Sequence, residues 1–142
     1  MPPATTAAIP PAVARPLPGI LTNWTGRTLQ APLKIITPAG FDYYVKLVVP
    51  ASGRDALALY VRGGQALEVE VPLGSYRMRY ASGEVWRGMA HLFGPAALTR
   101  YNEANSVLHF HSEGDRVSGY TVELIPQAHG NLRVRSLTPS EF

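Results

Sequence analysis

The chain has 142 residues, and 13 Lys and Arg against 10 Asp and Glu give it a formal net charge of +3. This surplus is too small to require a polyanionic partner, and the absence of cysteine excludes a disulfide framework, a thiolate nucleophile and a cysteine zinc site. No stretch has the roughly 18 apolar residues of a membrane span, and the first residues lack the pattern of a signal peptide. We therefore expect a protein made in the cytoplasm, with no membrane partner.

Residues 1–30 are rich in proline, with six prolines in the first 18 positions. Proline fixes φ and removes amide donors, so this segment favours an extended, polyproline-like conformation without a core of its own. We expect residues 1–30 to form a docking arm for a protein partner. Leu21 and Trp24 would be its buried anchors, and Arg15 and Arg27 would contact an acidic rim.

Residues 31–142 carry short β-type segments separated by Gly or Pro. This pattern predicts an all-β domain, a single antiparallel β-sandwich of seven to eight strands. Two short helical turns are expected, one over residues 96–104 and one over residues 136–142, where Thr138 and Glu141 have the spacing of a capping box. The expected strands are Leu33–Thr37, Tyr43–Val49, Ala56–Arg62, Leu67–Val71, Tyr76–Tyr80, Val107–His111, Val117–Leu124 and Leu132–Arg135.

The segments Leu67–Val71 and Tyr76–Tyr80 predict a β-hairpin. A four-residue loop would place three apolar pairs opposite one another, and would also pair Glu70 with Arg77 and Glu68 with Arg79. The preceding strand could pair with Leu67–Val71 in the same way, or the chain could cross to a second sheet there.

Residues 43–83 contain the turn Val71-Pro72-Leu73-Gly74-Ser75-Tyr76 between two strand-like segments. This stretch resembles the carboxypeptidase regulatory-like and transthyretin-like β-sandwich modules, which have a V-P-x-G-x-Y turn. The resemblance covers about forty residues, and Trp86 to Gly94 has no counterpart in those modules. It implies a mostly non-catalytic role in adhesion, carbohydrate contact or structural support.

His109 and His111 would share one face of a strand, the spacing of histidines in β-barrel metal sites. His91 or His129 would have to supply a third ligand, with Glu113 or Asp115 nearby. The simpler interpretation is that both imidazoles project outward while Leu108 and Phe110 fill the core. We expect no bound metal and no cofactor, and a cupin-like metal-dependent enzyme is the second alternative.

Other chemistry has little support in the sequence. No G-x-S-x-G turn or phosphate loop occurs. Glu68 and Glu70 are expected to be ion-paired and so unsuited to glycoside hydrolysis. The arginines of the predicted hairpin are expected to be neutralised, which argues against nucleic-acid binding.

Trp86, Arg87, Met89 and Phe93 lie in a dense apolar segment bounded by glycines. Two interpretations stay open: the segment plugs one end of the sandwich, or it forms an interface patch of aromatic and basic residues. We expect a non-enzymatic structural or assembly module, of the kind that decorates or cements a phage virion or a bacterial surface assembly, docking through its arm in a homo- or hetero-oligomer. The alternative is a carbohydrate- or peptide-binding β-sandwich module.

Overall fold

The computed structural model describes residues 9–95, 98–124 and 134–142. It is an all-β sandwich, as predicted, and no helix occurs in these residues. None of the described segments is therefore a helix that could span a membrane. The strands are β1 Gly19–Asn23, β2 Ala31–Ile36, β3 Asp42–Val48, β4 Asp55–Val61, β5 Ala66–Val71, β6 Gly74–Gly83, β7 Arg100–Phe110, β8 Ser112–Glu113, β9 Arg116–Val117, β10 Tyr120–Glu123 and β11 Val134–Ser136.

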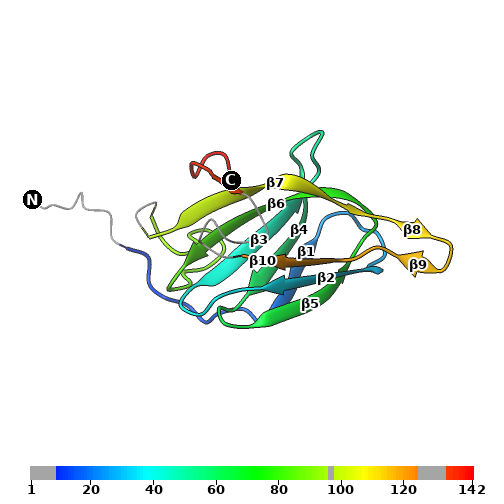
Figure 1. Ribbon diagram of the computed structural model, residues 1–142. Coiled ribbons are helices and arrows are strands. Elements are labelled where there is room, and N and C mark those ends of the chain that lie inside the picture. The colour runs from blue at the N-terminus through cyan, green and yellow to red at the C-terminus, as the bar shows by residue number, and fades with distance from the viewer. Residues whose placement is uncertain (1–8, 96–97, 125–133) are drawn as a thin grey trace, which may run out of the picture.

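Two stacked sheets make up the body (Figure 1). Sheet A has six strands in the order β1-β4-β3-β6-β7-β11, and sheet B has three in the order β10-β2-β5. All neighbours are antiparallel except β10 and β2, which run parallel. β8 and β9 form a separate hairpin that extends beyond the sandwich.

The main core lies between the two sheets. Alternate residues of each strand point into it, as a sheet with one buried face requires. Leu33 and Ile35 of β2 face Leu57, Leu59 and other apolar residues of sheet A, and all of these are fully buried.

A second apolar cluster covers the other face of sheet A. It contains Tyr44, Tyr60 and Ala81 from the strands, together with Trp86 and Phe93 from the segment after β6. The Trp86 ring stands edge-on to Tyr60 at 5.1 Å and to Phe93 at 5.4 Å. Sheet A is therefore buried on both faces, which explains why β3 and β4 are apolar at nearly every position.

The predicted hairpin of β5 and β6 does not form. β5 belongs to sheet B and pairs with β2, whereas β6 belongs to sheet A and pairs with β3 and β7. The apolar residues of β5 and β6 meet across the core instead of along one sheet. Arg79 pairs with the buried Glu103 at 2.6 Å, so the predicted pairing with Glu68 is wrong. The chain likewise crosses between sheets from β4 to β5, the second of the two options that the sequence left open.

The boundary predicted at residue 30 also needs correction. Gly19–Asn23, part of the predicted arm, is strand β1 and pairs antiparallel with β4 at the edge of sheet A. Its residues are half-buried, and Ile20 packs against the main core. Sequence reasoning missed this short strand because it follows the proline-rich residues 1–18 and has no strong alternation of apolar and polar residues.

The two predicted helical turns have different outcomes. Residues 100–104 lie in β7 and pair with β6 and β11, so the helical prediction there is wrong, and residues 96–97 lie outside the described part. At the other position a turn does form. Glu141 Oε1 accepts a 2.8 Å hydrogen bond from the Thr138 backbone amide, as the capping-box spacing predicted.

Candidate docking surfaces

The first candidate surface lies at the end of the sandwich where residues 9–18 cross the body. Four contacts hold this segment. Arg87 Nη1 donates to Pro10 O at 2.6 Å, the Val13 amide donates to Trp86 O at 3.0 Å, and Arg62 Nη2 donates to Pro16 O at 3.0 Å. Arg15 forms a 3.1 Å ion pair with Asp42. The described part of the predicted arm therefore lies on its own body, and Arg15 meets an acidic residue of the same chain.

Trp86 and Phe93, two of the predicted interface residues, are core residues. Both are buried in the second cluster, and Arg87 Nε donates to Phe93 O at 3.2 Å, which ties the segment after β6 into a compact loop. The plug interpretation placed this loop at one end of the sandwich, whereas it packs on the outer face of sheet A, and this packing accounts for the burial of Trp86 and Phe93. Met89, in contrast, is 53% exposed, and Arg87 sits between the buried loop and the arm.

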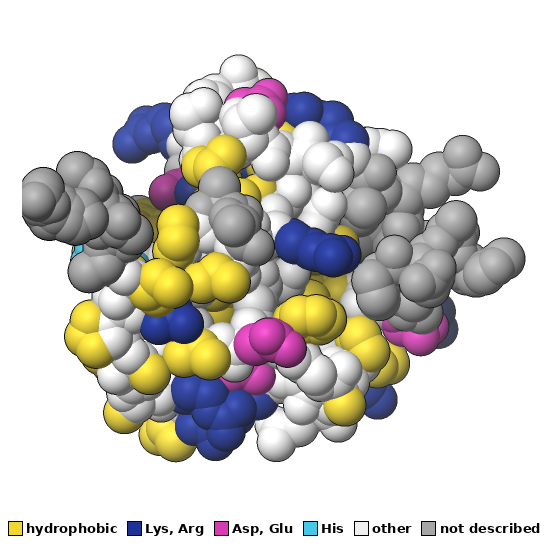
Figure 2. Space-filling model, turned by 90° about the vertical axis from the view of Figure 1, so that its left-hand side faces the viewer, with side chains coloured by type: hydrophobic (Ala, Val, Ile, Leu, Met, Phe, Trp, Pro, Cys, Tyr) yellow, Lys and Arg dark blue, Asp and Glu magenta, His cyan; other side chains and the backbone are white. Residues whose placement is uncertain are grey.

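Exposed apolar side chains remain on the arm and on this loop, and we call them together the arm-end patch. Figure 2 views this end of the molecule, where hydrophobic side chains lie among Lys, Arg, Asp and Glu side chains. The most exposed member is Leu17, at 79%. The loop side is built from Val85 and Met89, and the arm side from Ile9, Val13 and Leu17.

The remaining predicted interface residues lie elsewhere. Leu21, on β1, packs in part against the second cluster. Trp24 follows β1 at the opposite end of that strand, where its amide donates to Ala56 O, and it is half-exposed. Arg27 donates a hydrogen bond to Leu73 O. Arg15, Arg87 and Met89 thus lie on the arm and the adjoining loop, whereas Trp24 and Arg27 follow the far end of β1.

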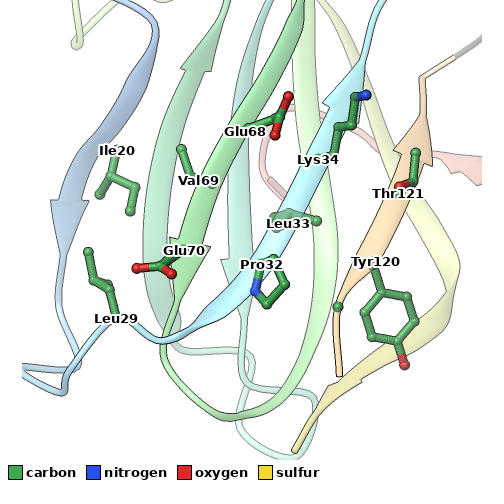
Figure 3. A pocket seen from close by; sticks show the side chains of 11 residues that line it. Ile20, Leu29, Pro32, Leu33, Lys34, Glu68, Val69, Glu70, Tyr120 and Thr121 are labelled. Atoms are coloured by element: carbon green, nitrogen blue, oxygen red, sulfur yellow. The ribbon is translucent and has the colours of Figure 1, made fainter. Parts of the chain in front are cut away.

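The second candidate surface is a groove on sheet B with a volume of about 750 Å³, shown in Figure 3. It runs from the seam between β1 and β5, across the outer face of β2, to β10. We call it the sheet B groove. Its wall contains Ile20, Leu29, Pro32, Leu33, Lys34, Glu68, Val69, Glu70, Gly119, Tyr120 and Thr121.

Glu68 and Glu70 point outward from β5 into this groove. Lys34 is the cross-strand neighbour of Glu68, and Pro32 is the neighbour of Glu70. No ion pair of either glutamate occurs among the described residues. Sequence reasoning missed the groove because it assigned both glutamates to arginines of β6. The alternation of Pro32 and Lys34 with the buried Leu33 and Ile35 on β2 was the available signal.

A third group of polar residues lies where β6, β7 and β10 approach one another. Ser75 Oγ is 2.8 Å from His109 Nδ1, a contact that sequence reasoning missed because it required the β6 to β7 register. Both residues are exposed, and the His109 amide is held by Tyr120 Oη at 2.9 Å. No described carboxylate contacts the His109 ring, so the pair lacks the orienting acid of a hydrolase triad.

His109 and His111 both point outward from the end of the β7 segment, as the simpler interpretation of the sequence expected. Within the described ranges, no three His, Asp or Glu side chains converge as metal ligands. His129, one possible third ligand, lies outside the described residues.

Burial and neighbouring groups shift the pKa of several titratable side chains. Burial, together with a 2.6 Å hydrogen bond to Asp42, raises the pKa of Tyr60 well above its ordinary value. Burial and the neighbouring Tyr43 raise the pKa of Tyr80 to about 12. Burial acts to raise the pKa of Glu103, but the hydrogen bonds and charges of Arg79 and Arg135 outweigh it and hold this pKa below its ordinary value. These groups stay in one ionisation state near neutral pH.

Comparisons of the chain with protein-family models, with curated proteins and with solved structures found no match. The resemblance to carboxypeptidase regulatory-like and transthyretin-like modules stays a prediction from the sequence.

Proposed function

We propose that the chain is a non-enzymatic structural module that joins an assembly by docking on a protein partner through the arm-end patch. The observation that carries the proposal is the exposure of Ile9, Val13, Leu17 and Met89 on two segments that are hydrogen-bonded to each other. Single exposed apolar residues are common on protein surfaces, but several on two segments that are joined by hydrogen bonds favour an interaction site at this end of the molecule.

The support under the patch favours a preformed docking surface. Arg87 links the arm to the loop, and the buried Trp86 and Phe93 anchor the loop on sheet A. Pro10, Pro11, Pro16 and Pro18 stiffen the arm, so less conformational entropy is lost when a partner covers it. An apolar centre framed by arginine is typical of the residues that contribute most to protein interfaces.

The finer proposal is that the assembly is a phage particle, decorated or cemented by this module, or a similar bacterial surface structure. It comes from the combination of a compact β-body and a Pro-rich N-terminal segment. The test is to purify such particles from the source strain and to measure the copy number of this chain relative to the major shell protein. A fixed ratio supports the finer proposal, and absence of the chain from the particles contradicts it.

The docking surface itself can be tested with a triple variant, Ile9→Ser, Val13→Ser and Leu17→Ser. We expect it to reduce occupancy of the assembly at least about tenfold, or to abolish concentration-dependent self-association in sedimentation experiments, because apolar burial is lost. The thermal midpoint should stay within a few degrees of the parent. Val49→Ser is the matched control, since Val49 is an exposed apolar residue in the turn after β3. Unchanged association of the triple variant would overturn the proposal.

A further inference from the structure

We propose that the sheet B groove binds an extended segment of a partner protein that carries Lys or Arg at alternate positions. This site is separate from the arm-end patch and does not depend on the function proposed above. Figure 3 shows its arrangement: Glu68 and Glu70 on β5, Pro32 and Lys34 on β2, and Tyr120 and Thr121 on β10.

The backbone at the groove favours an extended ligand. β5 is an edge strand of sheet B, and within the described ranges its outer side pairs with no other strand. β1 pairs with β4 in sheet A, but part of it comes within 8 Å of β5 (Cα to Cα), so an added strand has room only along the rest of the β5 edge. An edge strand presents unpaired amide and carbonyl groups that can accept one more strand from a partner. The volume of about 750 Å³ falls in the range of ligand-binding clefts.

The charges of the groove favour a basic segment. Glu68 and Glu70 are two positions apart on one strand, so their side chains share a face at a spacing of about 7 Å. A strand added beside β5 repeats the same spacing, and its alternate side chains would lie beside the two carboxylates. Lys34 offsets one of the two negative charges, and the Cα partner of Glu70 is the uncharged Pro32. The groove therefore keeps a net negative charge.

The apolar wall of the groove determines which residues the ligand should carry between its basic residues. Ile20, Leu29 and Val69 line the seam beside β5, and each is at least partly exposed there. The side chains of an added strand that point the other way would meet these three residues. The favoured ligand therefore alternates basic and β-branched apolar residues.

A carbohydrate is a poorer match for the groove. Sugar binding relies on an open aromatic face, and the groove has one aromatic residue among its lining residues, Tyr120. The Tyr120 ring packs edge-on to Phe110 at 5.0 Å, and its hydroxyl contacts the His109 backbone. This tyrosine is thus committed to packing.

The test uses the full chain and a synthetic probe, the end-capped peptide Val-Arg-Val-Arg-Val, titrated by calorimetry and by backbone amide NMR. Two peptides serve as controls: Val-Glu-Val-Glu-Val reverses the charges, and Arg-Arg-Val-Val-Val keeps the composition but breaks the alternation. We expect binding of the first peptide only, with amide shifts concentrated in β5 and β2. Affinity should fall as salt is raised.

Three variants locate the site. Glu68→Gln with Glu70→Gln should weaken binding at least about tenfold, because both carboxylates lose their charge. Lys34→Ala should strengthen binding about two- to fivefold, because a like charge is removed. Glu84→Gln, an exposed glutamate outside the groove, should change nothing. All of these side chains are at least partly exposed, and the amide spectrum reports whether each variant is folded.

The proposal is overturned if the alternating peptide does not bind, if the broken-alternation peptide binds equally well, or if the double glutamine variant keeps full affinity. It is also overturned if that variant abolishes self-association of the chain, because the occupant would then be a second copy. The triple variant Ile9→Ser, Val13→Ser and Leu17→Ser should still bind the alternating peptide. The two proposals can therefore be contradicted independently of each other.

Discussion

The hydroxyl of Tyr60 donates a 2.6 Å hydrogen bond to the buried carboxylate of Asp42. The same carboxylate accepts a 3.0 Å hydrogen bond from the Gly63 amide and forms an ion pair with Arg15. One acidic side chain thus joins the start of β3, the end of β4 and the N-terminal segment.

Asp42→Ala should destabilise the chain by about 2–4 kcal/mol, because the buried Tyr60 hydroxyl and Gly63 amide both lose their partner. Arg15→Ala should cost at most about 1 kcal/mol, because the Arg15 side chain is half-exposed. Chemical denaturation of both variants checks this. Equal losses would mean that the arginine, and not the buried hydrogen bonds, carries the stability of this site.

Trp86→Ala and Met89→Ala separate packing from docking within one loop. We expect the tryptophan variant to lose about 3–5 kcal/mol of unfolding free energy, because it empties the centre of the second cluster. The methionine variant should keep its thermal midpoint within a few degrees and weaken association instead. If Trp86→Ala weakened association and Met89→Ala lowered the unfolding free energy instead, the arrangement of the loop described above would be contradicted.

Glu103 predicts a specific dependence on pH. Its pKa is lowered in the folded chain, so its stabilising effect is present above the ordinary carboxyl pKa of 4.5 and is lost as pH falls through the folded value. At neutral pH Glu103→Gln should cost about 1–3 kcal/mol, and this difference should shrink below pH 4.5. Unfolding free energies of the parent chain and of Glu103→Gln, measured from neutral pH to below pH 4.5 with Glu84→Gln as control, would test this dependence. A difference between parent and variant that grows as the pH falls would contradict it.

Double-mutant cycles can test the strand pairing directly. Alanine substitution of Arg79 and Glu103 should give a coupling energy of about 1–3 kcal/mol, because they form a short, partly buried ion pair. The cycle of Glu70 and Arg77 should give a coupling within about 0.3 kcal/mol, since their strands lie in different sheets. A substantial coupling in the second cycle would restore the hairpin predicted from the sequence.

Two truncations from the N-terminus should have different effects on stability. A chain that begins at Gly19 keeps β1 and loses only the contacts of the arm, so its thermal midpoint should fall by a few degrees. A chain that begins at Ala31 also loses β1, which exposes the edge of β4 and the part of the main core that Ile20 covers. We expect its midpoint to fall by about 10 °C or more and the chain to aggregate. Calorimetry of the two truncated chains checks this expectation, which replaces the small effect that a boundary at residue 30 implied.

The sequence was a good guide to which residues form strands, because short apolar runs between turn residues, such as Ala56–Arg62, depend on local geometry. It was a poor guide to which strands pair. The arginines of β6 could match glutamates of β5 or of β7, and only the three-dimensional arrangement favours the buried Glu103.

The candidate site shows the same limit. The glycines around Trp86 marked a compact apolar loop, but its covering role depends on a second buried face of sheet A, which no local pattern reveals. The sheet B groove is built from four strands distant in sequence. Its acidic character became visible only when Glu68 and Glu70 were found without arginine partners.

The parallel pairing of β10 with β2 has a consequence for folding during synthesis. β2 leaves the ribosome early, yet one of its two neighbours comes from residues 120–123. β1 must similarly wait for β4. Early strands with late partners raise the contact order and slow folding, and their apolar faces stay open in the meantime. Sheet B can close only after residues 120–123 have been made, so β2 and β5 of the nascent protein stay exposed to misassociation until β10 emerges.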